Sequence, residues 1–402
     1  MIERKDILMI THFNTLPGEN GNSRFNFIAN LLATNHNVEV VTTNFSHGTK
    51  RFRELNNILF QKQKYKITFV NELGYKKNVS PMRLISHYYF GKNLKIFLSS
   101  RKKPSVIYCS VPSLDAGYIA ASFAKENDIK FIIDIQDLWP EAFKIVLKFP
   151  IIGKHIFGNM IKKANFIYEN ADEIIGVSQT YIERALSINQ KCKEGLSAFL
   201  GTDLVYFDSI AKNIYSEKKN EEFWLVYIGT LGHNYDLKSV IEAMNIVKKQ
   251  GYHKMKLKII GNGPLKKTFV NYSKELQINC DFIDRLPYEK MIEILVQCDV
   301  AVNPITKGAA GSIINKVGDY AAAGLPVLNT QESHEYMNLL NEYNAGYNCR
   351  NSDSKDLSEK IIKLYENPEI KEEQGKNNRR LAEDKFDRNK TYSALVTKVV
   401  NA

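Results

Sequence analysis

The chain has 402 residues, of which 44% are apolar and 25% are charged. This is the ordinary composition of a globular protein of two or three domains, and it excludes a collagen, a disordered tail and a disulfide-stapled miniprotein. No apolar run approaches the roughly 18 residues that a transmembrane helix needs. The five cysteines are scattered and the first residues lack the features of a signal peptide, so we expect a cytoplasmic location.

The positive charge is concentrated in one segment. The formal net charge is +11, yet residues 50–103 alone carry +12, from fourteen Lys or Arg against Glu54 and Glu72. This segment is also rich in aromatic residues, which suits an anionic membrane surface or a nucleic acid, or simply solvated lysines around an aromatic core. Residues 143–157 alternate apolar residues with Lys, as a helix lying in a membrane interface does. We therefore prefer a membrane surface as partner, and expect no nucleic acid because no nucleic-acid module accompanies the basic segment.

Short apolar runs alternate with helix-compatible segments, which is the pattern of a doubly wound parallel sheet. The first series of predicted strands comprises residues 7–10, 38–42, 67–70, 106–109, 131–135 and 173–177. The second series comprises residues 224–228, 256–260, 280–283, 300–303 and 326–329. Between them, residues 187–220 are polar and irregular. The sequence therefore predicts two α/β domains, whose strand-end loops would line a cleft if the domains face each other.

In the first half, the loop after the first predicted strand is a candidate ligand site. It contains His12, Gly18, Asn20 and Gly21 and leads into a helix that begins near Arg24. Backbone amides at such a helix start favour an anion, typically a phosphate. Glycine is common in any strand-to-helix turn, so a purely structural loop is the alternative. The dinucleotide fingerprint and the Walker loop are both absent.

In the second half, three glycine-containing loops follow predicted strands. The third leads into a helix on which Asn315 and Asp319 stand four residues apart, with Lys316 beside them. Loop amides and a lysine suit a diphosphate, and the Asp319 carboxylate can accept both hydroxyls of a ribose. These loops predict a nucleotide-diphosphate site, unless the segment is only a structural connection that ends at Gly324. The candidate residues of this nucleotide-diphosphate site are Gly229, Thr230, Gly232, His233, Gly261, Gly263, Gly311, Ser312, Asn315 and Asp319.

These motifs, in their order along the chain, resemble the donor-binding half of the family 4 glycosyltransferases, which have the GT-B fold. They are Gly229-Thr-Leu-Gly232, Gly261-Asn-Gly263-Pro264, the run 299–304, and Asn315-Lys316-x-x-Asp319-Tyr320 with Gly324-x-Pro326. The first half is similar to the same family in its loop 18–24, in Asp134-Ile-Gln-Asp137-Leu-Trp-Pro-Glu141 and in residues 171–178. The motifs Asp-Leu-Trp-Pro-Glu and Asn-Lys-x-x-Asp-Tyr resemble most the bacterial enzymes of surface-polysaccharide assembly.

The resemblance implies two Rossmann-like doubly wound domains that face a cleft. It implies an acceptor-binding domain (1–198), a linker (199–220), a nucleotide-sugar domain (221–380) and a C-terminal helix (381–402) that packs back on the first domain through Phe386. It also implies retaining transfer of a hexose or N-acetylhexosamine from a nucleotide-sugar, with a UDP-sugar expected. The expected acceptor is a polyprenyl-diphosphate-linked saccharide of capsule, O-antigen or exopolysaccharide assembly, at the inner face of the cell membrane. No Asp-x-Asp triplet occurs, so we expect a metal-independent reaction without a cofactor.

The sequence departs from the family at the donor site. Thr230 stands where an Arg is usual, Asp236 lies near the position of a usual Lys, and of the usual glutamate pair the first falls at Gly311 and the second at Asp319. We therefore expect Lys316, the loop amides and His233 to replace the missing charges, with Lys316 as a catalytic residue that stabilises the departing diphosphate.

On the acceptor side, Asp137 is the candidate for orienting or deprotonating the acceptor hydroxyl. Its alternative role is structural, as an acceptor for backbone N–H groups at the start of the helix that contains Trp139. Two other functions also stay open. One is a nucleotide-sugar 2-epimerase of the same fold, and the other is a non-catalytic partner subunit, which the missing Arg and Lys would permit.

Overall fold

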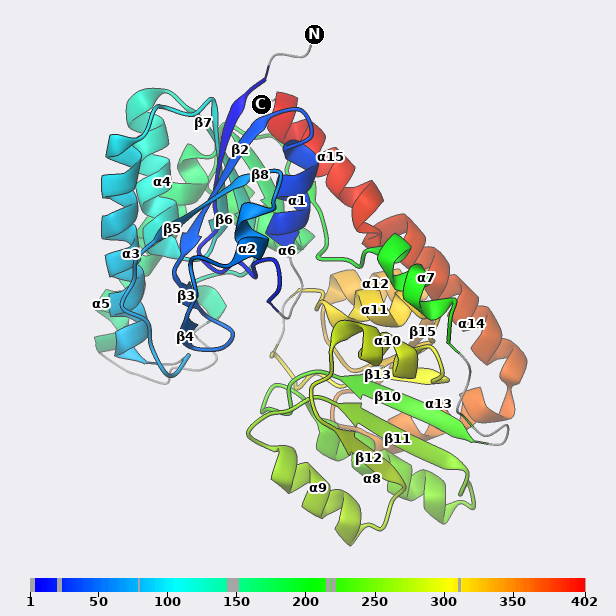
Figure 1. The fold of residues 1–402 in the computed structure, drawn as a ribbon. Helices are drawn as coiled ribbons and strands as arrows, with labels where there is room; N and C mark the ends of the chain where they lie inside the picture. Colours follow the sequence, from blue (N-terminus) through cyan, green and yellow to red (C-terminus); the bar gives the residue numbers. More distant parts are fainter. Residues whose placement is uncertain are drawn as a thin grey trace. The chain divides into compact units, whose positions relative to one another are not determined.

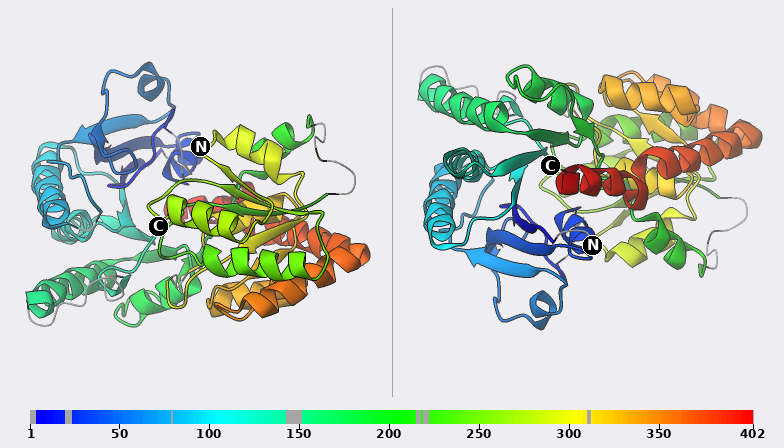
Figure 2. Two further views of the ribbon diagram at one scale, coloured as in Figure 1. Left: turned by 90° about the horizontal axis from the view of Figure 1, so that it is seen from below. Right: turned by 90° about the horizontal axis from the view of Figure 1, so that it is seen from above.

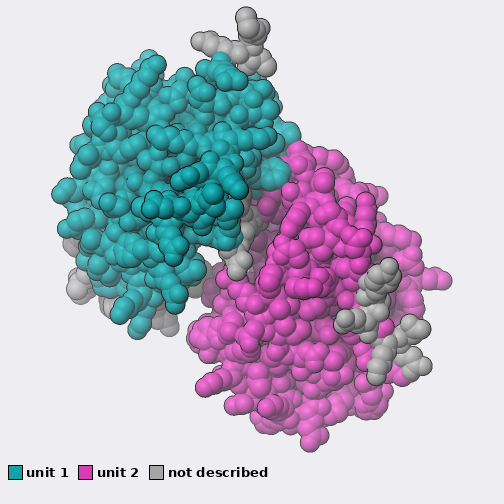
Figure 3. All heavy atoms as spheres, viewed as in Figure 1, with its two compact units in different colours: residues 1–198, 392–402 teal, residues 199–391 magenta. Residues whose placement is uncertain are grey.

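The computed structural model describes residues 4–19, 24–78, 80–142, 152–214, 218, 222–309 and 312–401. Two compact units divide the chain. Unit 1 comprises residues 1–198 and 392–402, and unit 2 comprises residues 199–391 (Figure 1 and Figure 3). Each unit is built around one parallel sheet with helices on both faces.

Unit 1 contains a seven-stranded parallel sheet in the order β5-β2-β1-β6-β7-β8-β9. Its strands are β1 (Asp6–Ile10), β2 (Asn37–Thr43), β5 (Lys66–Val70), β6 (Val106–Val111), β7 (Lys130–Ile135), β8 (Glu173–Gly176) and β9 (Leu196–Ser197). A small antiparallel hairpin, β3 (Phe45–Ser46) and β4 (Arg51–Phe52), follows β2. The strand order reverses between β1 and β6, and ligands of open α/β sheets bind at the carboxyl ends of the strands at such a switch point.

The helices of unit 1 cover the two faces of its sheet. They are α1 (Arg24–Leu32), α2 (Ile58–Gln61), α3 (Pro81–Ser100), α4 (Leu114–Asn127), α5 (Ile152–Asn170), α6 (Gln179–Leu186) and the end of α15 (Arg388–Asn401). Helices α3, α4 and α5 pack side by side on one face (Figure 2). On the other face, α1 and the end of α15 share an apolar core with β1, β2 and β6, to which α15 contributes Tyr392, Leu395 and Val399.

Unit 2 contains a six-stranded parallel sheet in the order β12-β11-β10-β13-β14-β15, which reverses between β10 and β13. Its strands are β10 (Phe223–Ile228), β11 (Met255–Ile260), β12 (Cys280–Ile283), β13 (Val300–Asn303), β14 (Val327–Asn329) and β15 (Gly346–Asn348). Its helices are α7 (Leu204–Ala211), α8 (Leu237–Lys249), α9 (Lys266–Glu275), α10 (Tyr288–Leu295), α11 (Lys316–Ala322), α12 (His334–Tyr343), α13 (Ser354–Glu366), α14 (Pro368–Leu381) and the π-helical turn η2 (Ala382–Phe386). One apolar core holds α8, α9 and α13, and a second core holds α7, α10, α11, α12 and α14.

The predicted fold class of two doubly wound parallel sheets is confirmed. Every predicted strand is present, with ends that differ by at most two residues from those predicted. The predicted linker 199–220 includes helix α7, whose Leu204 and Phe207 pack in the core of unit 2. We expected Phe386 to anchor the C-terminal helix on the first domain. It lies instead in the core of unit 2, where its ring packs against Phe199.

A buried ion pair joins distant segments of unit 1. Arg24, the first residue of α1, donates from Nε and Nη2 to the two carboxylate oxygens of Asp134 at 2.8 and 3.1 Å. Its Nη1 donates to the carbonyl of Ala198 and to the hydroxyl of Tyr392, and Tyr108 donates to Asp134. Burial disfavours the guanidinium charge, but Asp134 outweighs it, so the pKa of Arg24 lies above its usual value. The pair holds α1, β7 and α15 together.

The variant Arg24→Met should therefore lose about 3–5 kcal/mol of unfolding free energy, because it leaves the Asp134 carboxylate buried without its partner. Urea unfolding measures this loss. The control variant is Lys66→Met, which removes the lysine of the ion pair with Glu39; the Lys66 side chain is 70% exposed. Its loss of unfolding free energy should stay below about 1 kcal/mol. Equal losses in the two variants would contradict a structural role for Arg24.

Candidate functional site

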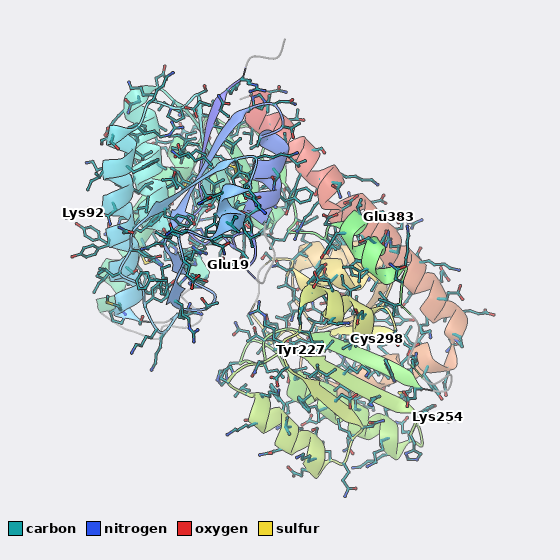
Figure 4. All side chains as sticks on the ribbon, in the orientation of Figure 1. Glu19, Lys92, Tyr227, Lys254, Cys298 and Glu383 are labelled. Atoms are coloured by element: carbon teal, nitrogen blue, oxygen red, sulfur yellow. The ribbon has the colours of Figure 1, made fainter. Side chains whose placement is uncertain are left out.

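Lys316 lies beside the carboxyl end of β10, at the switch point of the sheet in unit 2. It is the first residue of α11, and its ammonium nitrogen stands 4.2 Å from the ring centroid of Tyr227 and 4.1 Å from that of Tyr235. Figure 4 shows Tyr227 at this end of β10. A Cβ atom at position 229 would collide with the Lys316 ammonium, and Gly229 has a φ of 142°. Glycine at this position therefore lets the lysine approach the strand end.

The ammonium group of Lys316 lacks an acceptor among the described residues. Its Nζ atom is buried and has no hydrogen-bond partner in the described part of the chain. Burial lowers the pKa of Lys316 well below its usual value. The two tyrosine rings compensate only in part, because a cation over an aromatic ring gains about 2 kcal/mol when desolvated, whereas burying an unpaired charge costs several kcal/mol. An anion bound here would supply the missing acceptor.

The loops after β10 and β11 pack against each other next to Lys316. The amide of Gly229 donates to Ile260 and that of Leu231 donates to Asn262. A Cβ atom on Gly261 would overlap the carbonyl of Gly229, and one on Gly263 would overlap the carbonyl of Leu231. These glycines are therefore needed for the close packing of the two loops. Among the described residues, the amides of Thr230 and Gly232 have no acceptor, so they remain available to a ligand.

Asp319 lies one turn along α11 from Lys316. Its Oδ1 accepts hydrogen bonds from the hydroxyls of Thr202 at 2.9 Å and Tyr288 at 2.7 Å. Burial raises the pKa of Asp319, although these two hydrogen bonds act in the opposite direction. Within the described part of the chain, Oδ2 has no partner. Hydrogen bonds within unit 2 thus fix one carboxylate oxygen of Asp319, and the other oxygen is available to a hydrogen-bond donor such as a ribose hydroxyl.

The remaining predicted donor-site residues lie around the same strand ends. His233 and Thr230 are exposed, and their carbonyls accept from the hydroxyls of Thr306 and Tyr227 respectively. Ser312 is half-buried, and its carbonyl accepts from Gln331. Asn315 is exposed at the N-cap of α11 without a capping hydrogen bond. Gly311 lies outside the described residues.

Sequence reasoning missed a row of asparagines at this edge. Asn303, Asn329 and Asn348 are the last residues of β13, β14 and β15, and they lie in register. Asn303 donates to Asn329, and Asn329 donates to Asn348, both at 2.8 Å. Beside them opens a pocket of about 520 Å³, whose lining includes Gln331 and Glu332. The sequence feature that could have revealed this row is the asparagine at the end of each of these apolar runs.

In unit 1, the structure gives two predicted site residues internal partners. His12, directly after β1, is 1% exposed and lies stacked between Phe13 and Phe90. Its Nδ1 lies 2.6 Å from Ser113 Oγ, and its Nε2 lies 3.2 Å from Glu72 Oε1. Arg24 is engaged with Asp134, as described above. Their predicted contact with a ligand stays a prediction, and the observed partners favour structural roles.

The loop predicted to bind an anion is described only in part. Gly18 has a φ of 85°, in the left-handed region. Asn20 and Gly21 lie outside the described residues, so their predicted role stays a prediction. In the described part of the chain, no group of three or more His, Cys, Asp or Glu side chains is placed to hold a metal ion.

Asp137 has the local geometry of the structural alternative. Its Oδ1 accepts from the backbone N–H of Leu138 at 2.9 Å, and its Oδ2 accepts from the indole N–H of Trp139 at 3.0 Å. Burial raises the pKa of Asp137, while these hydrogen bonds act to lower it. The carboxylate is thus held in place between Leu138 and Trp139. Its catalytic role stays a prediction.

Comparisons with known proteins show which proteins the chain resembles in sequence and in fold. The family model "Glycosyl transferases group 1" matches residues 210–381. The solved structure of Anabaena HepE in complex with UDP has a TM-score of 0.72 at 13% identity, covering 99% of this chain and 100% of that chain. WaaG, a glycosyltransferase involved in lipopolysaccharide biosynthesis, has a TM-score of 0.66 at 14% identity, covering 98% and 100%. An uncharacterized glycosyltransferase of Methanocaldococcus jannaschii, MJ1178, is 21% identical over 344 residues, which are 84% of this chain and 88% of its own.

The matched segment contains the strand-end loops of unit 2 and all of α11, and so includes Lys316 and Asp319. The fold of nearly the whole chain is that of these two solved structures, which are of similar length and include the glycosyltransferase WaaG. The chain therefore has the GT-B fold, and its residues 210–381 are similar to the group 1 glycosyl transferases, a family of retaining hexosyltransferases.

Proposed function

We propose that unit 2 binds a UDP-sugar with its diphosphate against the Lys316 ammonium, and that the enzyme transfers a hexose or N-acetylhexosamine from it. The observation that carries this proposal is the buried Lys316 ammonium, which has no acceptor among the described residues. Its position at the carboxyl edge of the sheet is where nucleotides bind in such folds. HepE, whose fold is similar, is solved with UDP, and this supports the choice of uridine nucleotide.

In this proposal, each group at the strand ends has a separate task. Lys316 opposes the charge that develops on the departing diphosphate, which is where a fixed cation lowers a barrier most. The amides of Thr230 and Gly232 donate to phosphate oxygens, and Oδ2 of Asp319 accepts from the ribose. Ser312, Asn315 and His233 border the same edge and would contact the sugar or the nucleotide. Lys316 thus replaces the arginine whose usual position is taken by Thr230.

The proposed acceptor is a polyprenyl-diphosphate-linked saccharide at the inner face of the cell membrane. Of the fifteen large apolar side chains that are exposed in the described residues, eleven lie between Phe52 and Ile96. This range falls inside the segment 50–103 that carries the excess positive charge. Exposed apolar and basic side chains together suit an anionic lipid surface. WaaG acts in lipopolysaccharide biosynthesis, which supports an acceptor of this kind.

Helix α3 presents the proposed membrane-facing surface. Tyr88, Tyr89 and Ile96 are exposed on it, and Lys92 and Lys95 are exposed between them. Figure 4 shows Lys92 pointing outward from α3. No described helix is both long enough and apolar enough to cross a bilayer. The amphipathic stretch predicted at 143–157 lies largely outside the described residues.

The variant Lys316→Met should weaken UDP binding by about ten- to a hundredfold, the worth of a charge-assisted hydrogen bond, and should abolish most sugar transfer. The free protein should be at least as stable as wild type, because a buried unpaired charge is removed. Isothermal titration and thermal unfolding measure the two effects. Lys363→Met is the control, since Lys363 also stands over a tyrosine ring but is exposed. Unchanged UDP affinity in Lys316→Met would overturn the donor site.

The reaction itself is tested by product analysis. With a lipid-linked saccharide present, the proposal predicts a lengthened lipid-linked product and free UDP. Without acceptor, the sugar nucleotide should stay intact over the same period. Conversion to its C2 epimer without acceptor would instead indicate an epimerase, and failure to consume or bind any UDP-sugar would indicate a non-catalytic subunit.

The stability of the free protein should depend on pH through Lys316. Burial lowers the pKa of Lys316 in the folded protein, so the unfolded chain binds a proton at pH values where the folded protein has lost it. Stability therefore rises with pH between the two pKa values, by at most about 1.4 kcal/mol per pH unit. The difference in unfolding free energy between wild type and Lys316→Met, measured at several pH values, isolates this contribution. A difference independent of pH, or one that falls as pH rises, would contradict an unpaired ammonium.

Membrane binding is tested with the double variant Tyr88→Ser/Ile96→Ser, whose side chains are 60% and 62% exposed. Its partition onto vesicles that contain phosphatidylglycerol should fall about tenfold, because two apolar side chains no longer enter the interface. Co-sedimentation at low salt measures this partition, which added salt should also reduce. The control is Val205→Ser/Tyr206→Ser, which removes exposed apolar side chains from unit 2. Equal effects of the two double variants would contradict docking through α3.

A further inference from the structure

Two cations of unit 1 face the same tyrosine ring. The guanidinium carbon of Arg83 lies 5.8 Å from the ring centroid of Tyr75, and the ammonium nitrogen of Lys50 lies 4.9 Å from it. Glu72, which lies close by, accepts hydrogen bonds from Thr43 and Ser86 and pairs with His12. Among the described residues, neither Arg83 nor Lys50 forms an ion pair. The Lys50 ammonium also donates to the backbone carbonyl of His47. In the described part of the chain, the two positive charges are thus supported by neutral groups and aromatic rings and not by carboxylates.

Arg83 and His87 each carry a buried nitrogen that has no partner in the described part of the chain. Arg83 stands 4.5 Å from the ring centroid of Trp139 and 5.5 Å from that of Phe13. Its Nη1 donates to the carbonyl of Asn78 at 3.0 Å, but its Nε is buried and unpartnered among the described residues. His87, one turn further along α3, is 1% exposed, stacks on Trp139, and has an unpartnered Nε2. Such buried nitrogens are uncommon in proteins unless a water molecule, a ligand or an ion completes them.

The electrostatics of this cluster disfavour positive charge. Burial and the charge of Arg83 lower the pKa of Lys50 to about 8. Burial and the charges of Lys50 and Arg83 lower the pKa of His47 to about 3. The pKa of Arg83 is lowered by burial, although Tyr75, Asp137 and Glu72 act to raise it. A bound anion would relieve the mutual repulsion of these groups.

An apolar surface adjoins the cluster. The ring of Phe52 is 57% exposed and contacts Phe45, which in turn contacts Tyr75. Leu73 and Met82, which flank Tyr75 and Arg83 in the sequence, are 44% and 41% exposed. A ligand that is anionic at one end and apolar at the other matches both features. A phosphate or diphosphate ester of a long apolar alcohol has this chemistry.

We propose that Lys50 and Arg83 bind the diphosphate of the lipid-linked acceptor in unit 1, with the apolar chain of the lipid against Phe52. Trp139, whose ring contacts both the Arg83 guanidinium and His87, holds Arg83 in place as a positioning residue. This subsite rests on the proposed function and deepens it, since it names the residues that recognise the acceptor head group. It also gives a specific role to the basic segment 50–103.

The test measures binding of inorganic pyrophosphate and of farnesyl diphosphate by isothermal titration. It uses the full chain carrying Lys316→Met, so that the donor site does not contribute. Arg83→Gln and Lys50→Gln should each weaken pyrophosphate binding at least tenfold. Arg83→Lys should recover part of the loss, because it restores the charge. The control is Lys125→Gln, which removes an exposed cation that stands over the ring of Phe166 on another element of unit 1.

The two ligands separate a lipid head group from a free phosphate. Farnesyl diphosphate should bind more tightly than pyrophosphate, and Phe52→Ser should remove that difference. Equal affinity of the two ligands in the protein with Phe52 intact would overturn the lipid assignment. Equal pyrophosphate affinity for Arg83→Gln, Lys50→Gln and Lys125→Gln would overturn the subsite itself. UDP titration of the otherwise wild-type chain tests the donor site separately, so the two proposals fail by different measurements.

Discussion

The Lys316 ammonium, buried at the end of β10 without an acceptor in the described structure, is the constraint around which the edge of unit 2 is arranged. It is consistent with the glycine at position 229, where a Cβ atom would meet the lysine ammonium and where the φ of 142° is one that other residues rarely adopt. It also explains the positions of Tyr227 and Tyr235, whose rings are the only support that the described residues give the charge. A protein tolerates such a charge when a ligand completes it, because the cost of its burial is then recovered on binding.

The proposed subsite of unit 1 uses the same physical arrangement. Arg83 lies over Trp139, as Lys316 lies over two tyrosines, and both cations lack carboxylate partners in the described chain. Aromatic rings support a positive charge without neutralising it, so the charge keeps its attraction for an anion. Arg24 shows the contrast, since its guanidinium forms a buried bidentate pair with the Asp134 carboxylate. The distinction between a structural and a ligand-binding cation therefore lies in the kind of partner.

Much of the fold could be predicted from the sequence, because buried parallel strands are nearly continuous apolar runs. The sequence did not predict strands β3, β4, β9 and β15, each of which is only two or three residues long. Strands this short show no recognisable alternation of apolar and polar residues, and they form only because they pair with a neighbouring strand. Helix α7 was also missed, because its polar surroundings resembled a linker.

The candidate site could be predicted only in outline. The spacing of Lys316 and Asp319 pointed to a diphosphate and a ribose, but the absence of a partner for Lys316 needed coordinates. Arg24 finds its partner 110 residues away in Asp134, and His12 finds Ser113 at 101 residues. No local pattern reports such contacts. Arg83 and His87 were passed over, because in the sequence they belong to an ordinary basic helix.

The most direct test of the account is the pKa of the Lys316 ammonium itself, measured by NMR from the ¹³Cε shift of the labelled side chain in the free protein and with saturating UDP. The resonance is assigned by its loss in Lys316→Met. We expect a titration midpoint below the usual value for lysine in the free protein, and a clear rise when UDP binds, because the diphosphate stabilises the charged form. The same midpoint with and without UDP would contradict contact between Lys316 and the diphosphate.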